Sequence, residues 1–145
     1  MATRPAKPAK PKSPAPRKPV MKGTPNVIVD FIFDDGDLFI TVENLGDAPA
    51  LDVKTTFSEP MHGVLGGVHI NALALFRNIE FLAPHKSIRT FLDNSAAYFA
   101  RDEPRRITVR IDYCDMANKT YRLTLRHDLG IYADIGYLRR ERHSA

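Results

Sequence analysis

Alternation of apolar and polar side chains dominates this chain between residues 27 and 126. Across 106–113, Ile107, Val109 and Ile111 alternate with charged or hydroxyl-bearing residues, which is the period of a strand with one buried face. The same alternation, or a β-branched and aromatic composition, predicts the other strands. They are expected over residues 27–33, 38–43, 51–57, 79–81, 87–92 and 121–126. Short strands without a strand–helix rhythm favour an all-β fold, an antiparallel β-sandwich of about seven strands.

Turn-forming residues separate these predicted strands. Asp35-Gly36 stands between the first two, at the centre of a hairpin turn that needs positive φ. A corner at residues 44–50 separates the second predicted strand from the third. There we expect Asn44 to cap the backbone with its side chain and Gly46 to supply a positive φ. After the corner, Leu51 and Val53 are expected to share the buried face of the third strand.

Two stretches lack a clear period. Residues 58–78 predict a long loop with about one helical turn, and residues 94–104 predict a second irregular segment. Tyr98 and Phe99 are the apolar side chains expected to anchor the second one. A third change of pattern comes after residue 130, where Ile131 and Ile135 are at helical spacing but Gly136 weakens a helix.

Three motifs together resemble bacterial immunoglobulin-like domains of the CARDB type, over about residues 27–128. They are the corner 44–50 (NLGDAPA), the turn 81–84 (FLAP) followed by Ser87, and the pattern 109–115 (VRIDYCD) followed by Asn118 and Tyr121. His85 and Asn118 stand where glycine is usual, and asparagine tolerates a left-handed backbone. The resemblance implies an immunoglobulin-like sandwich and an adaptor or adhesion-like interaction module, and it carries over no catalytic residue.

Composition divides the chain into three parts: an arm at 1–25, a sandwich at 26–130 and an extension at 131–145. The arm holds seven of the 11 prolines and seven of the 21 basic residues, with no acidic one. The rest of the chain therefore carries 14 basic against 17 acidic residues, so the net charge of +4 comes from the arm. Such a segment cannot bury enough apolar surface to order itself, and it is predicted to be disordered.

The arm suits electrostatic attachment. Prolines recur every third residue from Pro5 to Pro14, the period of a polyproline II helix. Its cations could contact phosphates without reading sequence, or an acidic partner, and a solubilising tether is an equal alternative. The candidate contact residues are Lys7, Lys10, Lys12, Arg17, Lys18 and Lys22.

Location signals are few. The single cysteine, Cys114, permits no disulfide within the chain. No apolar run approaches the length that spans a bilayer, and the basic N-terminus has no apolar core behind it. We therefore expect no membrane span and a cytoplasmic protein from a bacterium or a phage.

Catalytic and metal-binding patterns are weak. The acidic residues of 34–37 fit a solvated turn better than a calcium loop, because their spacing does not match one. His62 and His69 lack the further ligands at short spacing that zinc requires. The glycines of 63–67 precede no Gly-Lys-Ser/Thr, and acidic neighbours oppose activation of Cys114. The sequence thus predicts no enzyme, no cofactor and no metal.

The apolar content of the loop has two interpretations. Loops at the ends of sandwiches often bind partners. These side chains could instead plug the end of the sandwich, and this second interpretation is slightly favoured. The residues concerned are Met61, Val64, Leu65, Val68 and Ile70.

The pattern as a whole favours a non-enzymatic protein-interaction module, or an accessory component of a larger assembly. The sandwich would make the specific contact, through the 58–78 loop or an exposed strand edge, with another protein or with its own subunits. Two alternatives remain: a nucleic-acid-associated protein that binds phosphates through the arm, and a phage or capsid accessory protein.

Overall fold

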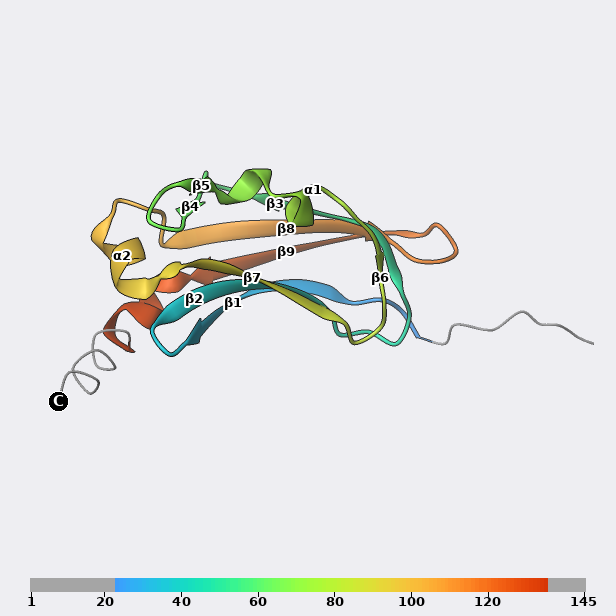
Figure 1. The fold of residues 1–145 in the computed structure, drawn as a ribbon. Helices are drawn as coiled ribbons and strands as arrows, with labels where there is room; N and C mark the ends of the chain where they lie inside the picture. The colour runs from blue at the N-terminus through green and yellow to red at the C-terminus, as the bar shows by residue number, and fades with distance from the viewer. Residues whose placement is uncertain (1–22, 136–145) are drawn as a thin grey trace, which may run out of the picture.

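Two antiparallel sheets face each other across an apolar core, in an immunoglobulin-like sandwich (Figure 1). The computed structural model describes residues 23–135. Sheet A has the order β1-β2-β7, from strands Val27–Asp34, Asp37–Asn44 and Ser87–Asn94. Sheet B has the order β6-β3-β8-β9, from strands Ile79–Leu82, Ala50–Phe57, Arg106–Cys114 and Thr120–Asp128. The predicted fold class and all seven strands are confirmed.

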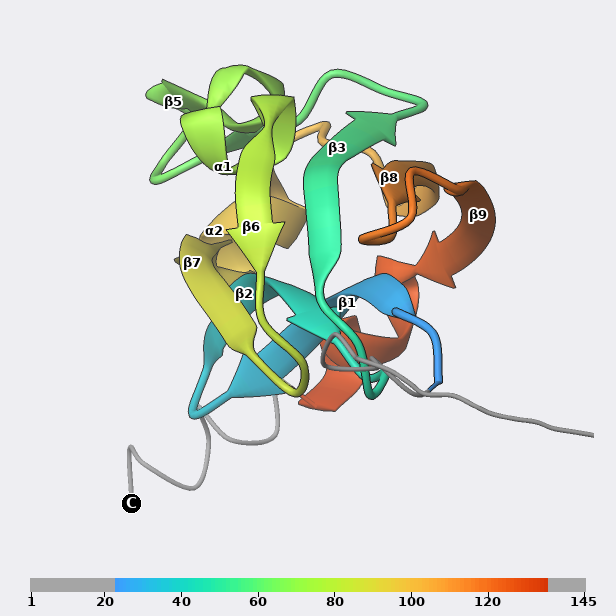
Figure 2. The same cartoon turned by 90° about the vertical axis from the view of Figure 1, so that its right-hand side faces the viewer.

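The core lies between the two sheets, whose arrangement is seen end-on in Figure 2. Alternate residues of each strand supply it, because successive side chains of a strand point to opposite faces. In β8, Ile107, Val109 and Ile111 are buried, as their alternation predicts. Tyr98, from outside the sheets, is also fully buried and is the predicted anchor of its segment.

The turns are made largely as the sequence predicts. Asp35 and Gly36 have φ of 51° and 87° in the β1–β2 hairpin, so both take the left-handed backbone of this turn type. Asn118 has φ of 66° between β8 and β9, in agreement with the tolerance of asparagine for this conformation. His85 takes φ of 63° between β6 and β7, where a glycine would be less strained.

Leu51 is on the opposite face from the predicted one. Asp52 has φ of 52°, and the pairing of β3 with β8 shifts register between Leu51 and Lys54. One extra residue in a strand reverses the face of the residues before it. Ala50 and Val53 therefore point into the core, whereas Leu51 is only half-buried.

Gly46 is needed for a different reason from the predicted one, because its φ is not positive. A side chain there would overlap the carbonyl oxygen of Thr24 and lie 2.7 Å from the amide nitrogen of Asn26. The corner thus requires glycine so that the backbone of 24–26 can approach closely. Asn44 does cap this corner: its Oδ1 accepts from Gly46 N at 2.9 Å and from Asn26 N at 3.1 Å.

The segment 58–78 has more structure than the predicted loop. It contains a two-strand ladder, two short helices and no long unstructured run. The elements are β4 (His62–Gly63), β5 (Val68–His69), the 3-10 helix η1 (Ile70–Ala72) and α1 (Ala74–Arg77). Helix α2 (Ser95–Ala100) lies in the second irregular stretch, and the 3-10 helix η2 (Leu129–Tyr132) follows β9. No helix within residues 23–135 is long and apolar enough to cross a membrane.

The two ends of the sandwich carry different segments (Figure 1). The corner after β2, the β6–β7 turn and the β8–β9 hairpin lie at the end where the described chain begins. The β1–β2 hairpin, the β4–β5 connection, α2 and η2 lie at the opposite end. Thr24 and Pro25, assigned to the arm by composition, belong to the fold, since Thr24 O accepts from Asp47 N at 3.2 Å and Pro25 is buried. Residues 1–22 of the predicted arm, and 136–145 of the predicted extension, are outside the described residues.

Candidate functional site

The connection between β4 and β5, residues 64–67, is called the tip. Val64, Leu65 and Gly66 have φ of 53°, 59° and 89°, three left-handed residues in succession. A left-handed backbone costs roughly 1–2 kcal/mol for each residue other than glycine, and a β-branched residue rarely adopts it. Strain of this kind persists only where the surroundings impose it, and it gathers at functional sites.

Strand β7 imposes this conformation on the tip. Val64 N donates to Leu92 O at 2.8 Å, and Leu65 N donates to Asp93 Oδ1 at 3.1 Å. A side chain on Gly63 would overlap the carbonyl oxygen of Leu92, so the close approach of β4 to β7 requires glycine there. Hydrogen bonds to β7 therefore hold the backbone amides of Val64 and Leu65, the first two residues of the tip.

Beneath the tip lies a cluster of three charged residues, Asp93, Arg101 and Glu103, here called the charged cluster. Arg101 Nη2 is 2.7 Å from Asp93 Oδ2, and Arg101 Nε is 3.6 Å from Glu103 Oε2. The side chain of Asp93 is only 1% exposed. A carboxylate so deeply buried is tolerated only when it is paired and hydrogen-bonded.

The charged cluster also binds the backbone of β4. Arg101 Nη2 donates to His62 O at 2.9 Å, and His62 N donates to Glu103 Oε1 at 3.0 Å. Both polar groups of the His62 backbone are thereby satisfied by side chains distant in sequence. The cluster thus connects β7, the segment after α2 and the tip in one network.

Helix α2 brings Arg101 to this position. Asn94 caps the helix, accepting from Ala97 N at 3.1 Å, as asparagine commonly does at a helix start. The hydroxyl of Tyr98 donates to Pro104 O at 2.6 Å, and burial, with the nearby Glu103 carboxylate, raises the pKa of this phenol. Tyr98 stays neutral and serves as a rigid support for the chain that leads to Arg101 and Glu103.

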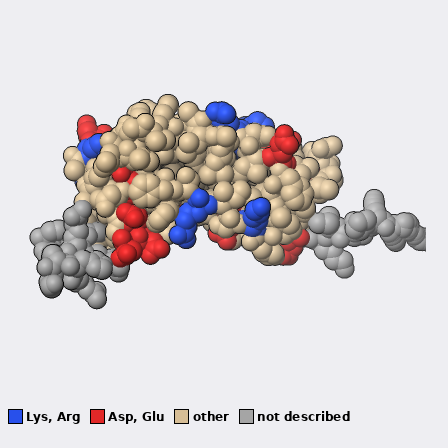
Figure 3. All heavy atoms as spheres, viewed as in Figure 1, with Lys and Arg blue, Asp and Glu red and all other residues tan. Residues whose placement is uncertain are grey.

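The structure divides the five residues that the sequence offered as partner contacts. Met61 and Ile70 are fully buried, and Val68 is half-buried against the core. These three plug the end of the sandwich and offer little surface to a partner. Val64 and Leu65 are 44% and 75% exposed, at the tip. The surface over β4 and β5 shows few charged side chains, whereas acidic ones gather over the β1–β2 hairpin (Figure 3).

Sequence reasoning missed the charged cluster. Asp93, Arg101 and Glu103 are polar residues in or beside an irregular stretch, where solvent exposure is the ordinary expectation. The only signal in the sequence is that Asp93 directly follows the apolar end of a strand. That signal does not identify a partner.

Among the histidines within residues 23–135, only one pair is in contact. His62 and His69 stack across the β4–β5 ladder with ring centroids 5.0 Å apart, and His62 Nδ1 is 3.8 Å from Glu103 Oε1. His85 is beside Asp47 at the other end, and His127 contacts Val29 O. Within residues 23–135, no group of three or more potential ligand residues is placed to hold a metal ion.

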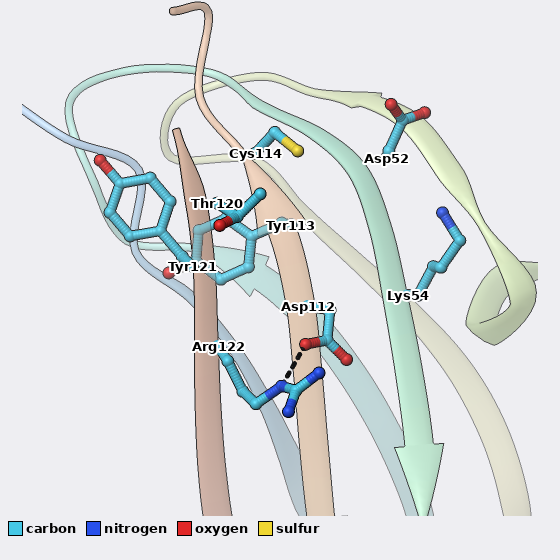
Figure 4. A pocket seen from close by; sticks show the side chains of 8 residues that line it. All are labelled: Asp52, Lys54, Asp112, Tyr113, Cys114, Thr120, Tyr121 and Arg122. Carbon is cyan, nitrogen blue, oxygen red and sulfur yellow. Dashed lines mark hydrogen bonds and ion pairs between the residues drawn. The ribbon is translucent and has the colours of Figure 1, made fainter. Parts of the chain in front are cut away.

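A hollow of about 660 Å³ lies on the outer face of sheet B (Figure 4). The side chains that line it come from β3, β8 and β9: Asp52, Lys54, Asp112, Tyr113, Cys114, Thr120, Tyr121 and Arg122. Partial burial acts to raise the pKa of Asp112, but hydrogen bonds and charge from Arg122 and Arg110 outweigh it and lower that pKa. Asp112 is therefore ionised and forms ion pairs with the guanidinium groups of Arg110 and Arg122. Ion pairs of this kind are ordinary on the exposed face of a sheet.

Comparison with known proteins gives one match. The model of a protein family described as a domain of unknown function (DUF8453) matches residues 17–133. No curated protein matches the chain, and no solved structure does. The match covers the whole sandwich together with the end of the basic arm.

Proposed function

We propose that this chain, which belongs to the DUF8453 family, is a non-enzymatic protein-interaction module whose tip makes the specific contact. The observation that carries the proposal is the exposure of Leu65, 75%, on a backbone that is strained and yet fixed. An apolar side chain held rigidly in solvent loses little conformational entropy when a partner covers it. Such preorganised anchors supply a large share of the affinity of protein interfaces.

The charged cluster supports this role, because the stability of the fold alone does not require buried charges at this position. Buried ion pairs contribute little net stability compared with apolar packing of similar volume. Here the cluster fixes the position of the tip through Asp93 and His62. Its role in the proposal is to position Leu65, not to contact the partner.

The basic arm complements the tip in this proposal. The six arm cations Lys7 to Lys22 lie outside the described residues, and their sequence suits attachment to an acidic surface. Figure 1 places the start of the described chain at the end opposite the tip. A partner or assembly could thus be held at two separate places, which raises overall affinity without a new contact.

A photo-crosslinking amino acid at position 65, introduced in cells of the organism that produces this protein, tests the proposal. We expect a discrete covalent adduct with one protein, which is lost when Arg101→Ala displaces the tip. The matched control is the same amino acid at Leu45, which is 46% exposed at the other end. Equal adducts from positions 65 and 45, or none from position 65, would contradict a specific contact at the tip.

The arm is tested separately in the full chain. Replacing the six cations by glutamine should weaken attachment to the crosslinked partner and remove most of its salt dependence. The same variant distinguishes the nucleic-acid alternative. Binding of duplex DNA that weakens steeply with salt, and that disappears in the glutamine variant, would place phosphate binding by the arm ahead of the interaction module.

A further inference from the structure

The sandwich has four edge strands, and they differ in how their outer backbone groups are satisfied. β1 and β7 border sheet A, while β6 and β9 border sheet B. β6 has only four residues, and the tip covers the end of β7 through the bond from Val64 N to Leu92 O. Short length and local covering are two ordinary ways in which proteins protect an edge.

The edge of β1 is capped by side chains of the opposite sheet and of η2. Val27 N donates to the Tyr113 hydroxyl at 3.3 Å. His127 Nε2 lies 2.9 Å from Val29 O, and the Tyr132 hydroxyl donates to Phe31 O at 2.9 Å. This edge is therefore closed to a further strand.

β9 has none of these devices. It pairs with β8 over nine residues without a register shift, and it contains neither proline nor glycine. The bonds Leu129 N to Arg105 O and Asp115 N to Lys119 O show that its odd-numbered residues bond to the β8 side. In an antiparallel ladder the even-numbered peptide groups then point outward. Among residues 23–135, no backbone or side-chain group bonds to those of Arg122, Thr124 and Arg126 on that side.

We propose that a second copy of this chain pairs with β9 along this edge, antiparallel and across a two-fold axis. The inference goes beyond the proposed function, because the pairing uses the edge of β9 and not the tip. Two copies of sheet B would form one continuous sheet of eight strands, since each sheet has four. A two-fold axis closes the assembly and leaves no free β9 edge.

Charge selects the register of this pairing. A two-fold axis at Thr124 would set Arg122 directly opposite Arg126 of the second copy, and like charges so placed are destabilising. An axis at Leu125 instead sets Arg122 opposite Asp128 of the second copy, twice by symmetry. It also keeps the outward peptide groups of the two strands facing each other.

Exposed apolar side chains at the two ends of β9 agree with this arrangement. Met116, in the hairpin before β9, is 56% exposed, and Ile131, after β9, is 62% exposed. Because the strands are antiparallel, the hairpin of one copy lies beside the segment after β9 of the other. Each copy thus brings Met116 toward Ile131 of its neighbour and covers apolar surface at both ends.

Sedimentation velocity of the full chain tests the pairing. We expect a dimer for the native sequence and for Thr124→Ala, and a monomer for Thr124→Pro, because proline removes the outward N–H at the centre of the edge. Circular dichroism should show the same fold for all three. A monomeric native chain, or a Thr124→Pro variant that stays a dimer, would overturn the proposal.

Cysteine crosslinking tests the register in a Cys114→Ser background. Leu125→Cys should give a disulfide-linked dimer on oxidation, because residues opposite at a non-hydrogen-bonded pair have Cα atoms about 4.5 Å apart. Leu123→Cys should not, because its two copies would be about 13 Å apart along the strands. The reverse result would refute the axis at Leu125. Leu65→Ser should leave the dimer intact, so failure of the tip proposal and failure of this one give different results.

Discussion

A neutral amide fixes the corner at the end of the sandwich where the described chain begins, here called the arm end, whereas the opposite end depends on buried charges. At the arm end, the amide of Asn44 is fully buried and bonds to Asn26, Gly46, Ala48 and Leu82. At the tip end, the Asp93–Arg101 pair holds a strained backbone. A neutral amide fixes a corner without desolvating a charge, whereas an ion pair imposes a conformation that is lost when either partner is removed. We infer that the interactions at the arm end stabilise the fold, whereas those at the tip end hold Leu65 in position for a partner.

The largest expected effect is that of Arg101→Ala at the tip end. It would leave the carboxylate of Asp93, 1% exposed, without its cation, and removing one partner of a buried pair costs about 3–5 kcal/mol. Urea denaturation measures this loss. Arg105→Ala is the matched control, because Arg105 is exposed and its removal loses only a surface cation–π contact with Phe99, worth about 0.5–1 kcal/mol. Equal effects of the two variants would show that the cluster does not hold the tip end.

Gly46→Ala should be the most damaging small substitution at the arm end. The new methyl group would meet the backbone of residues 24–26, which cannot move aside like a flexible side chain. We expect a loss of about 1–3 kcal/mol, typical of overpacking. Gly67→Ala, at the tip, is the control, since the nearest atom to its Cβ would be Val64 O at an ordinary 3.5 Å. A melting temperature unchanged in Gly46→Ala would contradict close approach as the reason for this glycine.

How much the sequence could predict differs between the two ends. At the arm end, Asn44 and Asn118 are recognisable because each acts on its own neighbouring backbone, and local patterns record local interactions. The role of Gly46 was only half predictable, since positive φ and close approach both require glycine. At the tip end, His62, Asp93 and Arg101 are distant in sequence. Their pairing leaves no periodic pattern, so it could not be read without the fold.

Val64→Asn should stabilise the protein while the tip keeps its shape. Val64 has φ of 53°, and asparagine adopts this backbone with less strain than a β-branched residue. We expect a gain of up to about 1 kcal/mol in the free energy of unfolding, measured by urea denaturation. Val64→Thr is the control, because threonine is polar but keeps the β-branch and should give no gain. A gain from both variants would mean that polarity at an exposed site, not relief of strain, is responsible.

The smallest effect is expected at the arm end, from Asp115 in the β8–β9 hairpin. Its Oδ1 accepts from Lys119 N at 3.0 Å and from Ala117 N at 2.8 Å, and its Oδ2 accepts from the Tyr121 hydroxyl at 2.9 Å. The backbone bond from Lys119, with the help of Tyr121 and Ala117, lowers the pKa of this carboxyl below its usual value of 3.8.

A carboxyl group whose pKa is lower in the folded than in the unfolded chain stabilises the fold above its unfolded pKa. That contribution is lost as the pH falls through the lowered folded pKa. Asp115→Asn should therefore melt slightly below the native protein at pH 7, and the difference should shrink as the pH falls below about 4. Melting curves across this range measure it. Because Asp115 is only partly buried and is screened by solvent, its effect should stay well below that of Arg101→Ala. A difference that grew toward low pH would contradict the bonding of the ionised carboxylate in the hairpin.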